Sequence, residues 1–430
     1  MAASTASTED APPPLEAPAP AWAPLRSRDF RLLCVTQLAT GMRTPMMFVT
    51  QAWYVNLAAP EDRRVLLLGL LATLRGLVFL SYVVFGGAIA DRFPRRRTLV
   101  LAHTMALVST AVTGALLYLP GASEGQGAWL PLFFLLFTAF GLVNAQDLPT
   151  RSAMIAESVP ASVLTSAVTI FQLSLASTML IGAPLAGQLI ERVGFGTTYL
   201  VAGAGHLVVL GALALMRSGQ AAADPDATSE SVLENMRAGL RQLRDDPVVR
   251  WIVLATWVSF TAGISVMGLL IAAWVHDVLA LDAAGWGTMM VFWGVGGVLA
   301  SGTLALRGEY GRKGPLFLGA LLVFGLAVLG FGLSRALLVA FLFNGVAGAA
   351  NQLVRILGIA SLQKVVPNRM LGRVMALLML SQGIAQTFGI AIGALGQAVG
   401  LQVLYPAAGA SLVLFALALA ASQRPLRTLD

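Results

Sequence analysis

Apolar residues along this chain fall into long runs that short polar stretches separate. From Phe30 onward each run is about 18 to 25 residues long, the length that an α-helix needs to cross a hydrocarbon core about 30 Å thick. The pattern therefore predicts an all-α membrane protein. The twelve predicted spans lie near residues 32–57, 65–87, 98–119, 129–147, 166–190, 197–216, 251–274, 284–306, 315–333, 336–355, 374–397 and 400–421.

The polar stretches divide the chain into regions. Residues 1–28 are rich in Ala, Pro, Ser and Thr and lack a basic start before an apolar core, so they are predicted to be a disordered cytosolic tail rather than a signal peptide. The spans then form an N-terminal six-helix bundle over residues 29–216 and a C-terminal six-helix bundle over 251–423. A cytosolic linker over 217–250 joins the bundles, and residues 424–430 form a cytosolic C-terminus.

The linker contains a second pattern. Val232, Met236, Leu240 and Leu243 recur at helical spacing, which indicates an amphipathic helix at the cytosolic membrane interface. A solvated linker helix fits the same spacing equally well.

Composition and charge agree with the membrane assignment. The chain is 57% hydrophobic and 11% charged, whereas soluble domains are about 45–50% apolar and about 25% charged. The net charge is +7, and most of the 28 Lys and Arg residues lie in the polar stretches on the side of the N-terminus. Because basic residues gather on the cytosolic side, both termini are expected in the cytosol of a cell with a bacterial-type inner membrane, and nucleic acid is excluded as a partner.

The chain offers little for cofactor or metal chemistry. Cys34 is its single cysteine, and its histidines, His103, His206 and His276, are far apart in the sequence. No phosphate-binding loop of the G-x-x-x-x-G-K-[ST] type is present, and no nucleophile with a base lies within a span. We therefore expect no metal, no cofactor and no enzymatic activity.

An internal repeat supports two related halves. The members of the repeat are 207 residues apart and fall at the end of the fourth and tenth spans and in the loops that follow. A six-plus-six arrangement with parallel halves is typical of transporters. The matching positions are Gly141, Asn144, Pro160 and Leu164 with Gly348, Asn351, Pro367 and Leu371.

A charged motif lies between spans two and three. Gly87-Ala-Ile-Ala-Asp91-Arg92-Phe-Pro-Arg95-Arg96-Arg resembles the loop signature of the major facilitator superfamily, with Pro94 at the usual second glycine. Gly87 permits close helix approach, and the arginines, among them Arg92, Arg95 and Arg96, reach carboxylates or helix C-terminal carbonyls. The resemblance implies a conformational latch, while a plain positive-inside loop is the alternative.

A second motif resembles that of one group within this superfamily. Asp147-Leu-Pro-Thr-Arg151 is similar to an element of the drug–proton antiporters that include macrolide and siderophore exporters, and the likeness extends from about Phe30 to Gln423. It implies two pseudo-symmetric six-helix bundles around a central cavity and proton-coupled alternating access. Asp147 and Arg151 would join the latch as part of a cytosolic charge relay; a structural role at helix ends is the other interpretation.

Span five carries Ala183-Pro184-Leu-Ala-Gly187, which resembles a reduced form of the antiporter signature. Pro184 and Gly187 are predicted to bend the helix and to allow close helix packing.

Two arginines lie inside predicted spans. Arg43 and Arg75 are about eleven and ten residues into their spans, roughly 15 Å deep, where each would cost about 2.5–3.5 kcal/mol if it faced lipid. None of the 21 carboxylates falls at mid-span, so an anionic substrate is the predicted partner. Hydrogen bonds to helix carbonyls are the alternative.

Other polar and aromatic residues within the spans are candidates for substrate contacts or, alternatively, for hydrogen bonds between helices. They are Gln51, Asn144, Trp257, Asn344, Asn351, Gln382 and Gln386.

Proton coupling needs a titratable group. Asp91 and Asp147 at the cytosolic rim and His206 in span six are the candidates, although a lone histidine is often structural. The sequence thus predicts an exporter of a small amphipathic or anionic organic compound that acts as a monomer with protons and membrane lipid as partners. An importer or facilitator of an anionic metabolite, or a membrane scaffold or sensor, are the alternatives.

Overall fold

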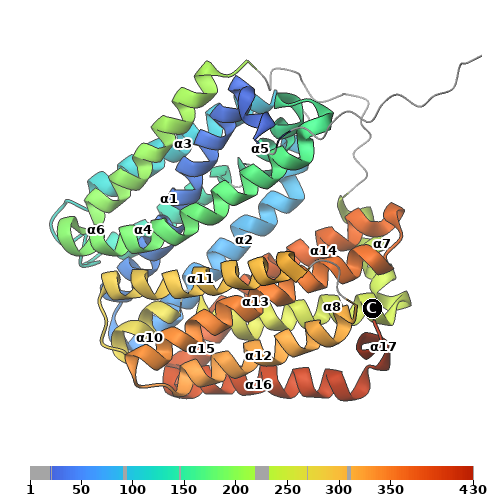
Figure 1. Ribbon diagram of the computed structural model, residues 1–430. Helices are drawn as coiled ribbons and strands as arrows, with labels where there is room; N and C mark the ends of the chain where they lie inside the picture. Colours follow the sequence, from blue (N-terminus) through green and yellow to red (C-terminus); the bar gives the residue numbers. More distant parts are fainter. Residues whose placement is uncertain are drawn as a thin grey trace, which may run out of the picture.

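Helices are the only regular elements in the described part of the computed structural model (Figure 1). The structure describes residues 20, 22–90, 94–144, 147–217, 232–268, 270–307 and 311–429. Its outer surface carries exposed apolar side chains such as Leu135, Leu173 and Leu414. Helices also satisfy their backbone polar groups internally, which a bilayer requires of any segment that crosses it.

The first half of the chain, here called the N-terminal half, runs from α1 to α6. Gly194, with φ 79° and ψ 175°, interrupts the 52 residues of α6, and glycine adopts this backbone conformation without a Cβ clash. We refer to the parts before and after Gly194 as the first and second segments of α6. The helices are α1 Arg28–Ala58, α2 Arg64–Ala90, α3 Arg95–Leu116, α4 Trp129–Asn144, α5 Asp147–Ser158 and α6 Leu164–Leu215, with 3-10 turns η1 Ala23–Arg26, η2 Glu61–Arg63 and η3 Ala161–Val163.

The C-terminal half, α8 to α16, begins with a helix that changes form. α8 continues into the π-helical turn η4 and then into α9, and Phe388 separates α14 from α15. The elements are α8 Pro247–Val258, η4 Ser259–Ile264, α9 Ser265–Met267, α10 Ile271–Asp277, α11 Ala283–Arg307, α12 Lys313–Leu333, α13 Leu337–Val365, α14 Asn368–Thr387, α15 Gly389–Val399 and α16 Leu401–Ser422.

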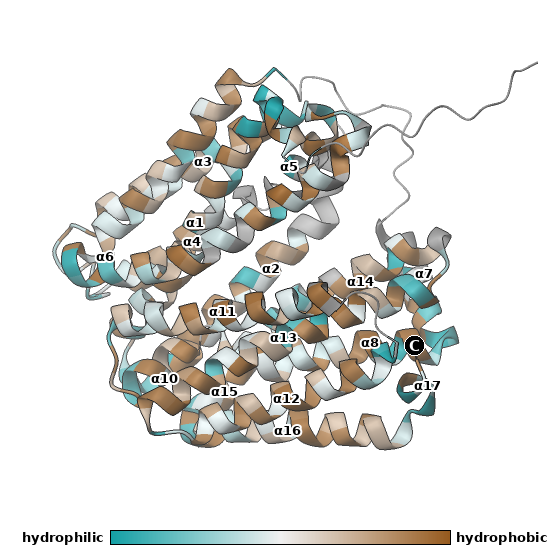
Figure 2. Ribbon diagram, in the orientation of Figure 1, coloured by the Kyte–Doolittle hydropathy of each residue, from teal (hydrophilic) through white to brown (hydrophobic). Residues whose placement is uncertain are grey.

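Two shorter helices are amphipathic or polar: α7 Val232–Asp245, within the predicted linker, and α17 Arg424–Arg427. α7 packs against α8 and α14. Leu243 is buried there, whereas Leu240 on the predicted apolar stripe is exposed. Figure 2 shows hydrophilic residues on α7 and α17 at one end of the molecule. We call this end of the molecule the α7 end. The opposite end, where α10 lies, is called the α10 end (Figure 1).

The chain is a multi-pass membrane protein. Over the described residues, eight helices are long and apolar enough to cross a membrane, and the bent pair α14 and α15 would make a ninth. Polar residues such as Gln37, Arg43 and Gln51 lower the hydropathy of α1, and α4 has only 16 residues. The predicted total of twelve spans is consistent with this helix order and stays a prediction.

The halves meet along two seams. α2 packs against α14 and α15, and the first segment of α6 packs against α11. A Cβ atom added to Gly69 would lie 2.3 Å from the carbonyl oxygen of Gly389, and one added to Gly187 would lie 2.2 Å from that of Ala283. The backbones therefore approach as closely as small residues allow.

Aromatic residues add to the contact at the α10 end. The ring of Trp53 on α1 lies 5.8 Å from the rings of both His276 on α10 and Trp286 on α11. Trp53 and Trp286 belong to a buried apolar cluster that extends across both halves, so this end of the molecule is closed by packing.

Candidate functional site

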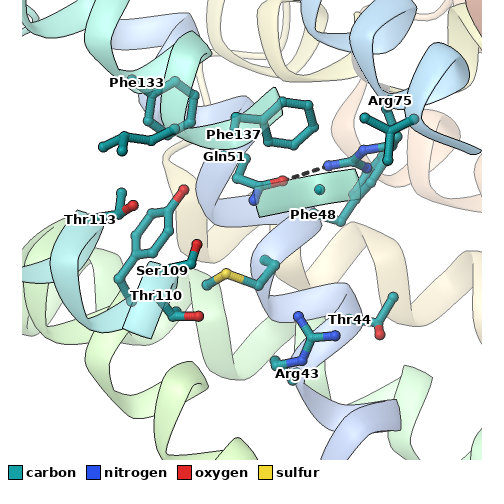
Figure 3. A pocket seen from close by; sticks show the side chains of 15 residues that line it. Arg43, Thr44, Phe48, Gln51, Arg75, Ser109, Thr110, Thr113, Phe133 and Phe137 are labelled. Atoms are coloured by element: carbon teal, nitrogen blue, oxygen red, sulfur yellow. Dashed lines mark hydrogen bonds between the residues drawn. The ribbon is translucent and has the colours of Figure 1, made fainter. Parts of the chain in front are cut away.

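A cavity of about 280 Å³ lies within the N-terminal half (Figure 3). α1, α2, α3, α4 and the second segment of α6 form its wall. Its lining combines two arginines with hydroxyl groups and aromatic rings. The lining residues are Arg43, Thr44, Met47, Phe48, Gln51, Arg75, Val78, Ser109, Thr110, Thr113, Phe133, Leu136, Phe137, Gly141 and Tyr199.

Arg75 is held at one side of this cavity by an amide and two aromatic rings. Its Nη2 atom donates a hydrogen bond of 2.7 Å to Oε1 of Gln51. Its Cζ atom lies 4.9 Å from the ring centre of Phe48 and 5.8 Å from that of Phe137. Among the described residues Arg75 forms no ion pair with a carboxylate. In the described part of the chain its positive charge is therefore stabilised by neutral groups, including the aromatic faces.

Gln51 positions the arginine from the neighbouring helix, because its Oε1 atom accepts the hydrogen bond of Arg75. Tyr199 on the second segment of α6 lines the same cavity.

Arg43 lies on the same helix as Gln51, on another side of the cavity (Figure 3). Eight residues separate them, or about 12 Å along the helix axis. Ser109, Thr110 and Thr113 of α3 provide hydroxyl groups along the wall. Two cations with hydroxyl donors and aromatic rings suit a ligand that carries an acidic group on an apolar or aromatic body.

The other candidates for substrate contacts lie elsewhere. Asn344 is buried, and its Nδ2 atom donates to the carbonyl oxygen of Met289 at 2.7 Å, a hydrogen bond between α13 and α11. Trp257 packs beside the core of the C-terminal half. Gln386 contacts α2 at Gly76.

The remaining candidates from the C-terminal half are Asn351, half-buried on α13, and Gln382, exposed on α14. None of these five C-terminal candidates lines the cavity, so the structure does not bring them together with Arg43, Gln51 and Arg75. Their substrate contacts stay predictions.

Several latch candidates fall where the structure gives no side chains. Asp91 and Arg92 lie outside the described residues. Gly87, Asn144 and Asp147 belong to α2, α4 and α5, but their side chains lie outside the description as well. Their predicted roles therefore remain predictions.

The described latch arginines connect helix ends within the N-terminal half. Arg95 at the start of α3 forms an ion pair with Glu157 at the end of α5. Arg96 donates through Nη2 to the carbonyl oxygen of Ala214, 3.0 Å away, in the last turn of α6. An arginine at a helix C-terminus satisfies a free carbonyl and opposes the negative end of the helix dipole.

Arg151 is buried, at 2% exposure. Its Nη1 atom donates to the carbonyl oxygen of Thr36 at 3.2 Å and to Oε1 of Gln37 at 2.8 Å. Arg151 thus ties α5 to α1 at the α7 end.

His206 lies beside a residue that the sequence interpretation did not pair with it. Its Nδ1 atom is 2.8 Å from Nδ1 of His103 on α3, and both side chains are 1% exposed. Two histidines in predicted spans three and six were the only available signal. Tyr199 and the hydroxyls of α3 were also missed, although Ser109, Thr110 and Thr113 recur at helical spacing.

Pro184 and Gly187 lie in the first segment of α6, facing α11. A Cβ atom added to Gly287 would be 2.8 Å from Cα of Pro184, and Gly187 is in similarly close contact with Ala283.

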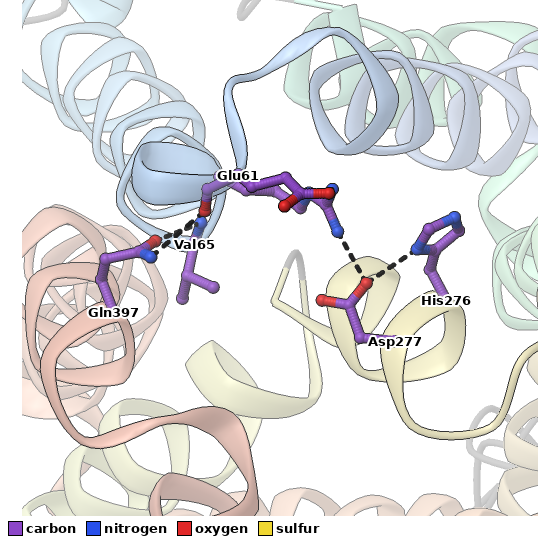
Figure 4. Close-up of polar contacts among 6 residues, drawn as sticks. Glu61, Val65, His276, Asp277 and Gln397 are labelled. Atoms are coloured by element: carbon purple, nitrogen blue, oxygen red, sulfur yellow. Dashed lines mark hydrogen bonds and ion pairs between the residues drawn. The ribbon is translucent and has the colours of Figure 1, made fainter.

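Polar contacts join the halves at the α10 end (Figure 4). Nη1 of Arg64, at the start of α2, lies 2.6 Å from Oδ1 of Asp277, at the end of α10, and Nδ1 of His276 lies 2.7 Å from the same oxygen. Oε1 of Gln397 on α15 accepts a hydrogen bond of 3.0 Å from the backbone N–H of Val65.

A further contact of this kind involves α6, where Oε1 of Glu191 accepts a hydrogen bond of 3.0 Å from the backbone N–H of Ala283. It satisfies an N–H group in the first turn of α11, which would otherwise have no partner within that helix. The described residues contain no group of three or more His, Cys, Asp or Glu side chains that could hold a metal ion.

Solved structures with the same fold are transporters. A POT family transporter in complex with a thioalcohol-conjugated peptide superposes with a TM-score of 0.74 at 13% identity, over 93% of this chain and 96% of that chain. A D-xylose–proton symporter gives a TM-score of 0.67 at 17% identity, over 91% and 96%.

A bacterial homologue of the human lysosomal transporter Spinster, in an inward-facing and unoccupied conformation, gives a TM-score of 0.66 at 16% identity, over 93% and 96%. At these identities the likeness shows the fold alone. No curated protein sequence matches the chain.

A family model described as transmembrane secretion effector matches residues 19–430. Because this match covers nearly the whole chain and the fold is that of known transporters, the protein is a membrane transporter and not an enzyme. The chain belongs to the transmembrane secretion effector family of the major facilitator superfamily.

Proposed function

We propose that this transporter exports a small organic compound with an acidic group and an apolar body, by proton-coupled alternating access. The observation that supports this substrate class is the cavity of the N-terminal half, where Arg43 and Arg75 lie among aromatic rings and hydroxyl groups. Because Arg75 has an amide as its hydrogen-bond partner, a ligand carboxylate can add a charge-assisted hydrogen bond without first breaking an ion pair.

The direction of transport and its coupling to protons are supported by the similarity of this chain to other transporters. The family is described by the word secretion, and one transporter of the same fold is a proton symporter. Together with the motif at Asp147 and Arg151, these features favour membership of the drug–proton antiporter group, with a bacterial-type inner membrane as location and both termini in the cytosol.

The arrangement of the halves fits a state ready to load cargo from the cytosol. The polar contacts that Arg64, Glu191 and Gln397 make between the halves lie at the α10 end, and those of Thr73 with Thr387 and Ile390 lie further along α2. With cytosolic termini, the α10 end faces outward and is closed, and the α7 end faces the cytosol. One rigid-body movement of the halves would then open the outer end.

Uptake of a specific anionic metabolite is the second candidate, because the same cavity would serve either direction. A membrane scaffold or sensor with this fold is the third candidate. It predicts that charge-neutral substitutions of Arg43 and Arg75 leave the distribution of small molecules across the membrane unchanged.

The test compares small molecules inside and outside cells that lack the gene with those of the same cells carrying it. Export predicts a compound that stays inside the cells lacking the gene. A compound left unconsumed in the medium would instead identify an importer. Cells carrying the variant Arg75→Gln should resemble the deletion strain for acidic compounds, and full restoration by this variant would remove the charge-recognition role.

A further inference from the structure

A second, smaller cavity adjoins the first one in the N-terminal half. It has a volume of about 20 Å³ and is lined by α3, α4, the loop between them and Tyr54 of α1. Three side chains, Thr113, Phe133 and Leu136, form part of the wall of both cavities. We propose that this smaller cavity, here called the α3–α4 chamber, receives the far end of the apolar body of the cargo and limits the length of the acid that the protein binds.

One face of α4 leads from the arginine site to the chamber. Phe137, Phe133 and Trp129 follow one another at intervals of four residues, so each lies about 6 Å, or one helical turn, closer to the start of α4. The ring centre of Phe137 is 5.8 Å from Cζ of Arg75. Phe137 lines the larger cavity only, Phe133 lines both cavities, and Trp129 lines the chamber only. These aromatic side chains mark a path about 12 Å long that begins beside Arg75.

The wall changes from polar to apolar in the same direction along α3. Ser109 and Thr110 bring hydroxyl groups to the larger cavity, and Thr113 lines both cavities. Leu116 and Leu117, about one turn further along, line the chamber. Both arginines lie in the wall of the larger cavity and neither lies in that of the chamber. A molecule with an acid at one end and an apolar group at the other therefore fits in one direction, with its apolar end in the chamber.

The wall of the chamber farthest from the arginines is fixed by packing. The hydroxyl group of Tyr54 donates a hydrogen bond of 2.7 Å to the carbonyl oxygen of Ala122, and both residues line the chamber but not the larger cavity. The ring centre of Tyr54 lies 4.7 Å from that of Phe133 and 5.5 Å from that of Phe195. A volume of about 20 Å³ holds roughly one group the size of a water molecule. An apolar body that extends further meets packed side chains.

The two cavities together favour an elongated acid over a compact one. A compact acid occupies the larger cavity alone, whereas an acid whose apolar body extends on the order of 10 Å along α4 also fills the chamber. Each methylene group that leaves water for an apolar wall raises the affinity about fourfold, until the chamber is full. The position of the acid end rests on the proposed function, in which Arg75 binds the carboxylate, whereas the length limit depends on the chamber.

Binding of phenylalkanoic acids of increasing length to the full-length protein, purified in detergent, tests the chamber. The series runs from benzoate through phenylacetate, phenylpropanoate and phenylbutanoate to phenylhexanoate, and calorimetry gives each dissociation constant. We expect the affinity to rise about fourfold with each methylene, to reach a maximum within the series and to fall beyond it. A constant affinity would overturn the proposal. So would a rise without a maximum, which is the result expected if the apolar bodies lie in detergent.

A pair of variants on α4 extends the test. Leu132 lines the chamber but not the larger cavity, so Leu132→Ala enlarges the chamber at a distance from Arg75. We expect the acid of highest affinity to be a longer one in this variant, with its affinity relative to phenylacetate raised about fourfold per added methylene. Leu135→Ala is the control, because Leu135 is exposed on the same helix and lines neither cavity. Equal length limits in the two variants would contradict the chamber, and the wild-type series decides the proposal even if Leu132→Ala fails to fold.

The variant Arg75→Gln distinguishes the chamber from the proposed function. Acids that lose affinity in Arg75→Gln but show no length limit in the wild type would support charge recognition and refute the chamber. A length limit that changes in Leu132→Ala, together with equal affinities in the wild type and Arg75→Gln, would support the chamber and refute charge recognition.

Discussion

Arg75 places a cation in the membrane-spanning part of α2 with neutral partners around it. The hydrogen bond to Gln51 and the rings of Phe48 and Phe137 reduce the cost of burial, but they do not neutralise the charge. Because Arg75 is a buried cation without a described counter-ion, its role in recognising an acidic substrate is the easiest to test.

We expect Arg75→Gln to weaken binding of an acidic compound far more than binding of its neutral amide. A charge-assisted hydrogen bond is worth about 1.5–3 kcal/mol, so the dissociation constant of the acid should rise roughly ten- to hundredfold. Binding of the matched pair to purified protein gives the measurement. Arg63→Gln, at an exposed position in η2, is the control, and equal losses for acid and amide would disprove charge recognition.

Arg151 offers a second test at this scale. Its contacts with Thr36 and Gln37 connect α5 to α1 within a buried environment, so Arg151→Met leaves these oxygens without their donor. We expect a loss of about 2–4 kcal/mol in the free energy of unfolding, measured as a lower melting temperature in detergent. Arg237→Met, at an exposed position on α7, is the matched control, and similar melting temperatures for both variants would show that the contacts add nothing.

At the scale of elements, the sequence predicted helices better than helix partners. Runs such as 98–119 match α3 closely, because length and apolar character are local properties. The separation of runs 166–190 and 197–216 coincides with Gly194, where the backbone of α6 breaks. The short helix α5, by contrast, lies almost wholly between the predicted spans 129–147 and 166–190, because its twelve residues have no long apolar run.

The candidate site was predictable only in part. Arg43 and Arg75 could be selected from sequence since a charge within a span is costly wherever it points. The pairing of His103 with His206, and the separation of Asn344 and Gln382 from the cavity, depend on how each helix is rotated about its axis. That rotation follows from packing between distant segments, which a single sequence does not specify.

The seam between α6 and α11 leads to a prediction about helix packing. A methyl group added to Gly187 would lie 2.2 Å from the carbonyl oxygen of Ala283, so Gly187→Ala forces the halves apart there. We expect a cost of about 1–3 kcal/mol and a lower melting temperature. Gly211→Ala changes the same helix at a site with nothing within 4 Å, so it should leave stability unchanged or slightly raised. Equal behaviour of the two variants would contradict the tight seam.

At the scale of the whole molecule, alternating access requires contacts that hold one end closed and then release it. Arg64 and Asp277 meet these conditions, because they lie on different halves and are joined by one ion pair of 2.6 Å. The apolar seams on α2 and α6 persist over several turns, whereas this pair involves only two helix ends. Its loss should therefore shift the balance of conformations without unfolding either half.

We predict that Arg64→Asp and Asp277→Arg each favour opening of the α10 end and that the double variant restores closure. The Asp277 side chain is 39% exposed, so solvent limits the coupling energy to about 1 kcal/mol, or a roughly fivefold change in the ratio of closed to open molecules. Spin labels on exposed sites of η2 and α10 report the distance between the halves. Arg63→Asp reverses the neighbouring charge, which pairs with Asp62 inside the same turn, and should leave the distances unchanged. Additive effects in the double variant would show that Arg64 and Asp277 do not act on each other, and closure would then depend on the packing of Trp53 and Trp286.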